Sequence, residues 1–158
     1  GAPRNAKTLC ADILDMRARI DLEHGTTNPW DIKYVHGGLM DLDFIAQYLM
    51  LLHAQDAPLI CGGSAADIFQ WLVNQGFMEE KPALELMGYY QFLGHMFNML
   101  RLCSEKNYAI NYAPQGLKKL LVGAAKETDF ESLSQRLIQV EQKVHAHYIS
   151  VLTSEEDL

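Results

Sequence analysis

The stretch that decides the fold is Pro82-Ala-Leu-Glu-Leu-Met-Gly-Tyr-Tyr-Gln-Phe-Leu-Gly-His-Met-Phe-Asn-Met-Leu100. Its large apolar residues recur every three or four positions: Leu86, Tyr90, Leu93, Phe97 and Leu100. This spacing keeps side chains on one face of an α-helix, and proline is favoured at the first helical position. The pattern predicts a helix from Pro82 to about Glu105. It favours core packing for this Met- and aromatic-rich face, with Gly88 and Gly94 allowing close approach of a neighbouring helix.

The same periodicity predicts helices over about 6–24, 38–55, 64–76, a short segment after Pro114, and 128–151. On the first helix the expected apolar stripe is Leu9, Ile13, Met16 and Ile20, with Gly25 as C-cap. Ser64 with Asp67, and Thr128 with Glu131, have the spacing of capping boxes. β-branched residues are scarce, and no long segment alternates as a strand does. We therefore expect an all-α fold, a single up-and-down helical bundle of about five to six helices.

The composition is that of one ordinary globular domain over residues 1–158, with 49% hydrophobic and 21% charged residues. No apolar run reaches the roughly 20 residues that a membrane span needs. The formal net charge of −7 argues against nucleic acid as a partner, and we interpret Lys118, Lys119 and Lys126 as a solvated helix face. The cysteines at 10, 61 and 103 are expected to be buried reduced thiols. Residues 1–4 and 153–158 are expected to be frayed or remnants of cloning.

The chain lacks the common catalytic motifs, so no catalytic residue and no metal site is predicted within it. One segment stands out, from Lys33 through Gly37-Gly38 to Asp41 and Asp43. A lysine and two glycines before a helix could bind an anion, because backbone N–H groups and the helix dipole favour negative charge there. The alternative is that Gly37 and Gly38 only allow a tight turn. A helix would point Asp41 and Asp43 apart, which excludes them as a metal-binding pair.

The same segment, Lys33-x-x-x-Gly37-Gly38-Leu-x-Asp41-Leu-Asp43-Phe-Ile-x-Gln47, resembles a signature of bacterial glutamine synthetase adenylyltransferase/deadenylylase, K…GG-x-x-D-x-E-F-x-x-Q. The likeness extends upstream through Asp15-Met-Arg-Ala-Arg-Ile20 and downstream through Ala113-Pro-Gln-Gly-Leu-Lys-Lys-Leu-Leu121. It covers nearly the whole chain and is greatest to the C-terminal helical domain of that enzyme. That domain follows the adenylylating nucleotidyltransferase domain.

The resemblance implies a non-catalytic fragment of a larger cytoplasmic bacterial enzyme. Such an enzyme transfers AMP from ATP to glutamine synthetase, removes it by phosphorolysis, and responds to the nitrogen-regulatory PII protein. ATP and Mg²⁺ would belong to the parent enzyme, and none is expected on this chain alone. The implied partners are the adjacent nucleotidyltransferase domain, glutamine synthetase and PII, with no nucleic acid and no membrane. The implied nucleotide-phosphate or interdomain contacts are Lys33, Gly37, Gly38, Asp41, Asp43 and Gln47.

Two departures from the family pattern bear on this site. Asp43 stands where the family usually has Glu, which shortens the reach of the carboxylate by one methylene. Val35 and His36 stand where a basic residue and a glycine are often found. A second hypothesis is a free-standing helical protein-interaction module with no enzymatic role, for which the Met- and aromatic-rich stretch would supply the adaptable surface.

Overall fold

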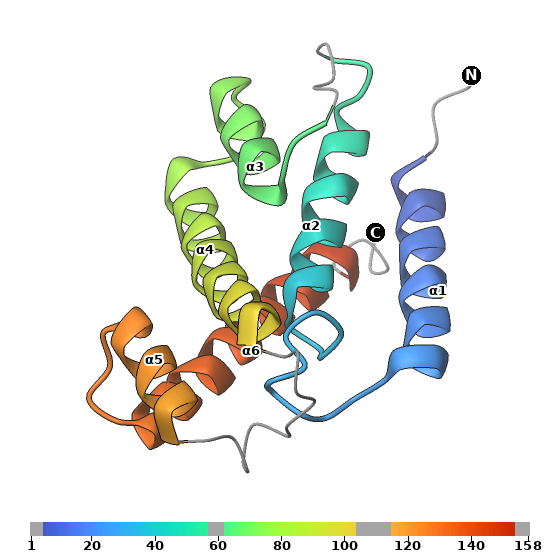
Figure 1. Ribbon diagram of the computed structural model, residues 1–158. Helices are drawn as coiled ribbons and strands as arrows, with labels where there is room; N and C mark the ends of the chain where they lie inside the picture. The colour runs from blue at the N-terminus through green and yellow to red at the C-terminus, as the bar shows by residue number, and fades with distance from the viewer. Residues whose placement is uncertain (1–4, 57–61, 104–114, 154–158) are drawn as a thin grey trace.

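The computed structural model describes residues 5–56, 62–103 and 115–153, which form six α-helices and no strand (Figure 1). The helices are α1 (Ala6–His24), α2 (Leu39–Leu52), α3 (Ala65–Asn74), α4 (Glu80–Cys103), α5 (Gln115–Ala125) and α6 (Phe130–Thr153). The all-α prediction is confirmed. Thr153, expected in a frayed end, is the last residue of α6, and the other residues of the two expected frayed ends lie outside the described ranges.

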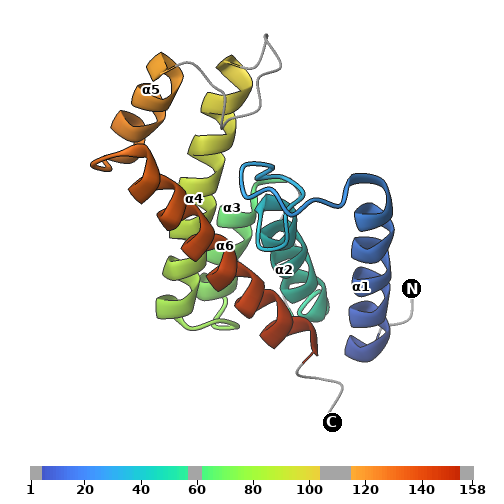
Figure 2. The ribbon, with the colours of Figure 1, turned by 90° about the horizontal axis from the view of Figure 1, so that it is seen from below.

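Helix α2 lies at the centre of the packing and contacts α1, α3, α4 and α6. The long helix α6 runs obliquely past α2 and α4, and α5 packs beside its beginning (Figure 2). The side chains that fill the core come from all six helices and include Ile45, Phe69, Leu93, Leu121 and Leu137. The loop between α1 and α2 lies near the point where α2, α4 and α6 meet (Figures 1 and 2). It contacts α1 through Arg17 and Tyr34, and α6 through Trp30 and Phe130.

Capping residues and prolines mark the starts of the helices, and the structure corrects two of the predicted starts. Ser64 and Asp67 form the expected capping box of α3. Helix α4 begins at Glu80, two residues earlier than expected; Pro82 is still in the first turn, where a missing N–H breaks no hydrogen bond. The predicted box of Thr128 is wrong, because the Asp129 carboxylate accepts the Ser132 N–H at 2.7 Å and so caps α6.

Burial corrects two further predictions. Met16 is 53% exposed, and Arg17 takes its place on the buried face of α1 because it pairs with a buried carboxylate. The predicted core face of α4 is confirmed at Leu86 and Leu93. Tyr90, Phe97 and Leu100 of the predicted stripe are half-buried, and Met96, which lies outside that stripe, is fully buried. The expected close helix approach at the two glycines of α4 is wrong, since an added Cβ at Gly88 or Gly94 would have nothing within 4 Å.

The remaining expectations concern thiols, lysines and membranes. Cys10 is a buried thiol and Cys103 a half-buried one, neither of them in a disulfide, whereas Cys61 lies outside the described residues. Lys119 and Lys126 are exposed, and Lys118 is half-buried with its ammonium 4.9 Å from the centre of the Phe130 ring. Among the helices that the structure describes, none combines the length and apolar character needed to cross a bilayer.

Candidate functional site

The loop that carries the sequence motif is folded by its own hydrogen bonds. The N–H of Val35 donates to the Asp31 carbonyl at 2.9 Å, and the N–H of Leu39 donates to the Ile32 carbonyl at 2.9 Å. The first bond closes a turn over residues 31–35, and the second joins the start of α2 to the loop residue that lies seven positions earlier. The loop therefore has a defined shape, and the side chains on it have defined directions.

A buried ion pair holds this loop against α1. Arg17 Nε lies 2.7 Å from Asp41 Oδ1, and the two side chains are only 5% and 1% exposed. Arg17 Nη2 donates to the Tyr34 carbonyl at 2.7 Å, and the second Asp41 oxygen accepts the Gly37 N–H at 2.6 Å. Buried charges need partners of this kind, because desolvation of an unpaired charge costs several kcal/mol. Asp41 is therefore a structural anchor of the loop.

Gly37 and Gly38 are required by close packing. Gly37 has a φ of +85°, and a Cβ there would lie 1.8 Å from the Glu141 carbonyl oxygen of α6. A Cβ on Gly38 would lie 2.1 Å from the Ile32 carbonyl oxygen. The Gly38 N–H donates to the Val35 carbonyl at 2.8 Å, so the amides of both glycines are used within the chain. These bonds favour the tight-turn alternative for the two glycines.

The other three motif residues, Lys33, Asp43 and Gln47, are exposed. Asp43 and Gln47 are one turn apart on α2, and residues four apart share a helix face. Neighbouring atoms crowd the Asp43 carboxyl, and this desolvation raises its pKa, while the positive charge of Lys33 opposes the rise. Asp43 also acts on Tyr90 of α4: burial raises the pKa of Tyr90, and the Asp43 charge raises it further. We call Lys33, Asp43 and Gln47 the polar face.

The motif therefore divides into a buried half and an exposed half. The helix points Asp41 into the protein and Asp43 to the surface, as its geometry predicts. Within the described ranges, no group of three or more His, Cys, Asp or Glu side chains is arranged to hold a metal ion.

The sequence analysis did not identify three residues that contribute to this region. They are Arg17, Tyr34 (through its carbonyl) and Glu141. Glu141 is 5% exposed, and burial raises its pKa to about 9, so the carboxyl is neutral at pH 7. The apolar periodicity of the helices could have indicated Arg17 and Glu141. Arg17 follows Ile13 by four residues and Glu141 follows Leu137 by four, so each charged residue falls on an apolar stripe.

Comparison of the chain with known protein families identifies the family to which it belongs. A family model described as GlnD PII-uridylyltransferase matches residues 9–152, which include the loop and both halves of the motif. The chain belongs to this family. No solved structure matches the chain.

The curated relatives of this family domain carry a different name, bifunctional glutamine synthetase adenylyltransferase/adenylyl-removing enzyme. The protein of Rhodopseudomonas palustris strain TIE-1 is 31% identical over 98% of this chain and 16% of its own length. That of strain BisB5 is 34% identical over 91% and 15%, and that of Xanthobacter autotrophicus is 32% identical over 96% and 15%. The resemblance stated from the sequence is confirmed, and the chain spans only about 15–16% of the length of these relatives.

Proposed function

We propose that this chain is a non-catalytic helical domain of an enzyme that adenylylates and deadenylylates glutamine synthetase. The observation that carries the proposal is the similarity to enzymes of that name across 91–98% of the chain but only 15–16% of their length. Catalysis, with ATP and Mg²⁺, would then belong to a separate nucleotidyltransferase domain of the same cytoplasmic polypeptide. The chain alone would be inactive.

The motif has a buried half and an exposed half, and this favours a structural role for the loop. Asp41, Gly37 and Gly38 have their polar groups occupied by internal contacts, so we assign them to holding the loop in place. That rigid support presents the polar face in one geometry, and a pre-positioned contact loses little conformational entropy when it forms. We assign Lys33, Asp43 and Gln47 to the contact with the nucleotidyltransferase domain.

Lys33 has a further role in this proposal. A lysine is a flexible point charge that suits phosphate groups, and preorganised cations stabilise the charge that develops in phosphoryl-type transfer. We place its ammonium at the mouth of the nucleotide site of the neighbouring domain. The remaining surface of the chain would face glutamine synthetase and the PII protein.

The test uses the polypeptide that carries this chain together with its catalytic domain. Lys33→Ala is expected to lower adenylylation of glutamine synthetase tenfold or more while the melting temperature stays unchanged, because Lys33 is exposed. Lys143→Ala, an exposed lysine on α6 outside the loop, is the matched control and should leave turnover unchanged. Unaltered turnover in Lys33→Ala would refute the role of Lys33.

A separate measurement tests the parent enzyme itself. An antibody to this chain is used to size the protein that it detects in a lysate of the source cell. A band several times larger than 17.9 kDa supports a domain of a multidomain enzyme. A band at 17.9 kDa would contradict the proposal and favour the free-standing interaction module.

A further inference from the structure

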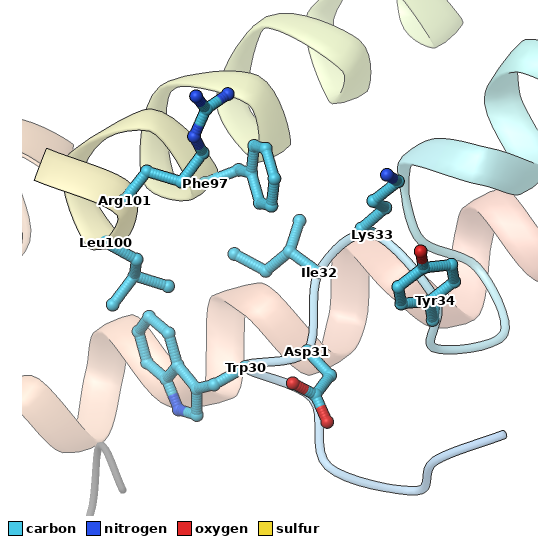
Figure 3. A pocket seen from close by; sticks show the side chains of 8 residues that line it. All are labelled: Trp30, Asp31, Ile32, Lys33, Tyr34, Phe97, Leu100 and Arg101. Atoms are coloured by element: carbon cyan, nitrogen blue, oxygen red, sulfur yellow. The ribbon is translucent and has the colours of Figure 1, made fainter. Parts of the chain in front are cut away.

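A pocket of about 250 Å³ opens where the middle of α4 meets the end of α5 and the second turn of α6. It is distinct from the pocket beside Lys33, between the α1–α2 loop and the C-terminal end of α4, which Figure 3 shows. Phe92 and Met96 give it an apolar wall. Gly88 also lines it, and an added Cβ there would have nothing within 4 Å. Because α4, α5 and α6 all contact one another, core packing fixes the shape of this pocket.

Arg136 of α6 lines the pocket and is held in a fixed position. Its Nη1 donates to the Ala125 carbonyl at 2.9 Å and to Glu127 Oε1 at 3.3 Å. The guanidinium carbon lies 4.3 Å from the centre of the Phe92 ring. Among the described residues, none accepts a hydrogen bond from Nε or Nη2 of Arg136. The guanidinium is therefore pre-positioned and keeps donors that an anion can use.

The other polar side chains that line the pocket are unpaired. Lys126, the residue directly after α5, is exposed, and its ammonium has no ion pair or hydrogen bond with any described residue. The Gln91 and His95 side chains lie one turn apart on α4 and likewise have no partner in the part of the chain that the structure describes. The described lining contains no Asp or Glu. Three polar side chains thus meet at one pocket with their hydrogen-bonding capacity unused.

The end of α5 opposes an anion, because the C-terminus of a helix carries roughly half a negative elementary charge. Its last carbonyls are already bonded, however. The Gly123 carbonyl accepts the Lys126 N–H at 3.2 Å, and the Ala125 carbonyl accepts Arg136. Glu127 offsets the charge of Arg136, and the charge of Lys126 exceeds that of the helix end, so the pocket stays positive by about half a charge.

We infer that this pocket binds a phosphate group, as the free ion or as part of a small phosphomonoester. The donors come from α4, from the end of α5 and from α6, so they approach a ligand from different directions. A phosphate offers at least three strong acceptor oxygens in a tetrahedral arrangement, whereas a carboxylate offers two in one plane. Arginine and lysine both suit phosphate, the first through its planar fork and the second as a point charge.

Size and location agree with this assignment. The volume of about 250 Å³ lies below the range of roughly 300–1,000 Å³ that is typical of sites for drug-sized ligands, which favours a small anion. The pocket shares no residue with the polar face, so the inference does not depend on the proposed contact with the nucleotidyltransferase domain. The two proposals can therefore fail separately, one in anion binding by this chain and the other in turnover of the longer polypeptide.

The test is an NMR titration of the ¹⁵N-labelled chain with sodium phosphate at pH 7 and constant ionic strength. We expect saturable shifts of the Lys126 and Glu127 amides and of the Arg136 Nε–H, with a dissociation constant on the order of 1 mM. The indole N–H of Trp71, which is 8% exposed in α3, is the internal control and should not move. Lys126→Gln should weaken binding about fivefold or more. Lys143→Gln, at an exposed lysine of α6 outside the pocket, should leave binding unchanged.

Three results would overturn the inference. They are the absence of a saturable shift up to about 20 mM phosphate, equal shifts with sodium acetate at the same ionic strength, and an unchanged affinity in folded Lys126→Gln. If this variant does not fold, as judged by the Trp71 resonance, Lys126→Asn replaces it with the same expected direction, because asparagine tolerates the φ of +55° at this position.

A final titration separates the two sources of the phosphate group. Glycerol 3-phosphate is compared with inorganic phosphate under the same conditions. Tighter binding of the ester would support the proposal with a small phosphomonoester as ligand, since its carbon chain can contact Phe92 and Met96. Equal affinity would support it with the free ion as ligand.

Discussion

Replacing Asp41 by Asn tests whether the buried half of the motif is structural. In the native protein the two Asp41 oxygens lie 2.7 Å from Arg17 Nε and 2.6 Å from the Gly37 nitrogen. The substitution keeps the shape of the side chain but removes its charge and one acceptor. Arg17, with a side chain that is 5% exposed, then loses its buried counter-ion.

The expected loss follows from these contacts. Removing one partner of a buried ion pair costs about 3–5 kcal/mol. Arg17 retains the Tyr34 carbonyl at 2.7 Å and the Asp21 carboxylate at 3.1 Å, and Asp21 is 28% exposed. We therefore expect Asp41→Asn to lower the free energy of unfolding by about 3 kcal/mol, the lower end of this range. For a domain of this size each kcal/mol lowers the melting temperature by about 2–4 °C, which gives about 6–12 °C.

The assay is urea and thermal denaturation followed by circular dichroism at pH 7. Asp43→Asn is the matched control, because it makes the same chemical change two residues away on the exposed side of α2. We expect it to change the free energy of unfolding by about 0.5 kcal/mol at most. The double variant Arg17→Met/Asp41→Leu should recover much of the lost stability, since neither charge remains buried. Equal effects of Asp41→Asn and Asp43→Asn would refute the reasoning.

Three further predictions concern other parts of the fold. Gly37→Ala should lower the free energy of unfolding by about 2 kcal/mol or more, since the φ of Gly37 is +85° and the Glu141 carbonyl blocks a Cβ there. Gly88 lies in mid-helix with open space around it, so Gly88→Ala should raise the free energy of unfolding by up to about 1 kcal/mol. Both variants are measured in the same urea titration. Glu141 has a pKa of about 9 in the folded state against an ordinary 4.5, so the folded state retains a proton that the unfolded state has lost between these values, and stability should fall as pH rises through that range. Glu141→Gln should flatten this dependence, and an unchanged slope between pH 5 and pH 8.5 would contradict the assignment. Ser64→Ala removes the α3 cap and should cost about 1 kcal/mol, seen as a lower melting temperature; no change would show that the capping box does not contribute.

The sequence was sufficient to locate the candidate site, but it did not show which of its residues are buried and which are exposed. The spacing of Lys33, the two glycines, Asp41 and Asp43 located the loop, and helix geometry separated the two aspartates. Which aspartate faces inward depends on where α1 lies, and that is set by packing rather than by the loop. The partner of Asp41, Arg17, is 24 residues earlier in the chain, which no local pattern connects.

The pocket that is lined by Trp30, Ile32, Phe97 and Arg101 depends still more on tertiary structure (Figure 3). Trp30 and Arg101 are about seventy positions apart in the sequence, and the residues between them form three different helices. Nothing in the local pattern of the two segments indicates that they share a cavity. They line one cavity because α4 packs on α2 and α6, which brings its C-terminal end close to the α1–α2 loop.

The sequence by itself determined the helices of this protein, because apolar periodicity, caps and prolines act within a few residues of one another. It predicted α1 from Ala6 to His24 and the capping box of Ser64, both as observed. Only the tertiary structure decided which polar groups are buried and which face solvent. Burial of Arg17, Asp41 and Glu141 depends on surfaces supplied by distant segments, and the free energy of a charged group changes with those surfaces more than with its sequence neighbours.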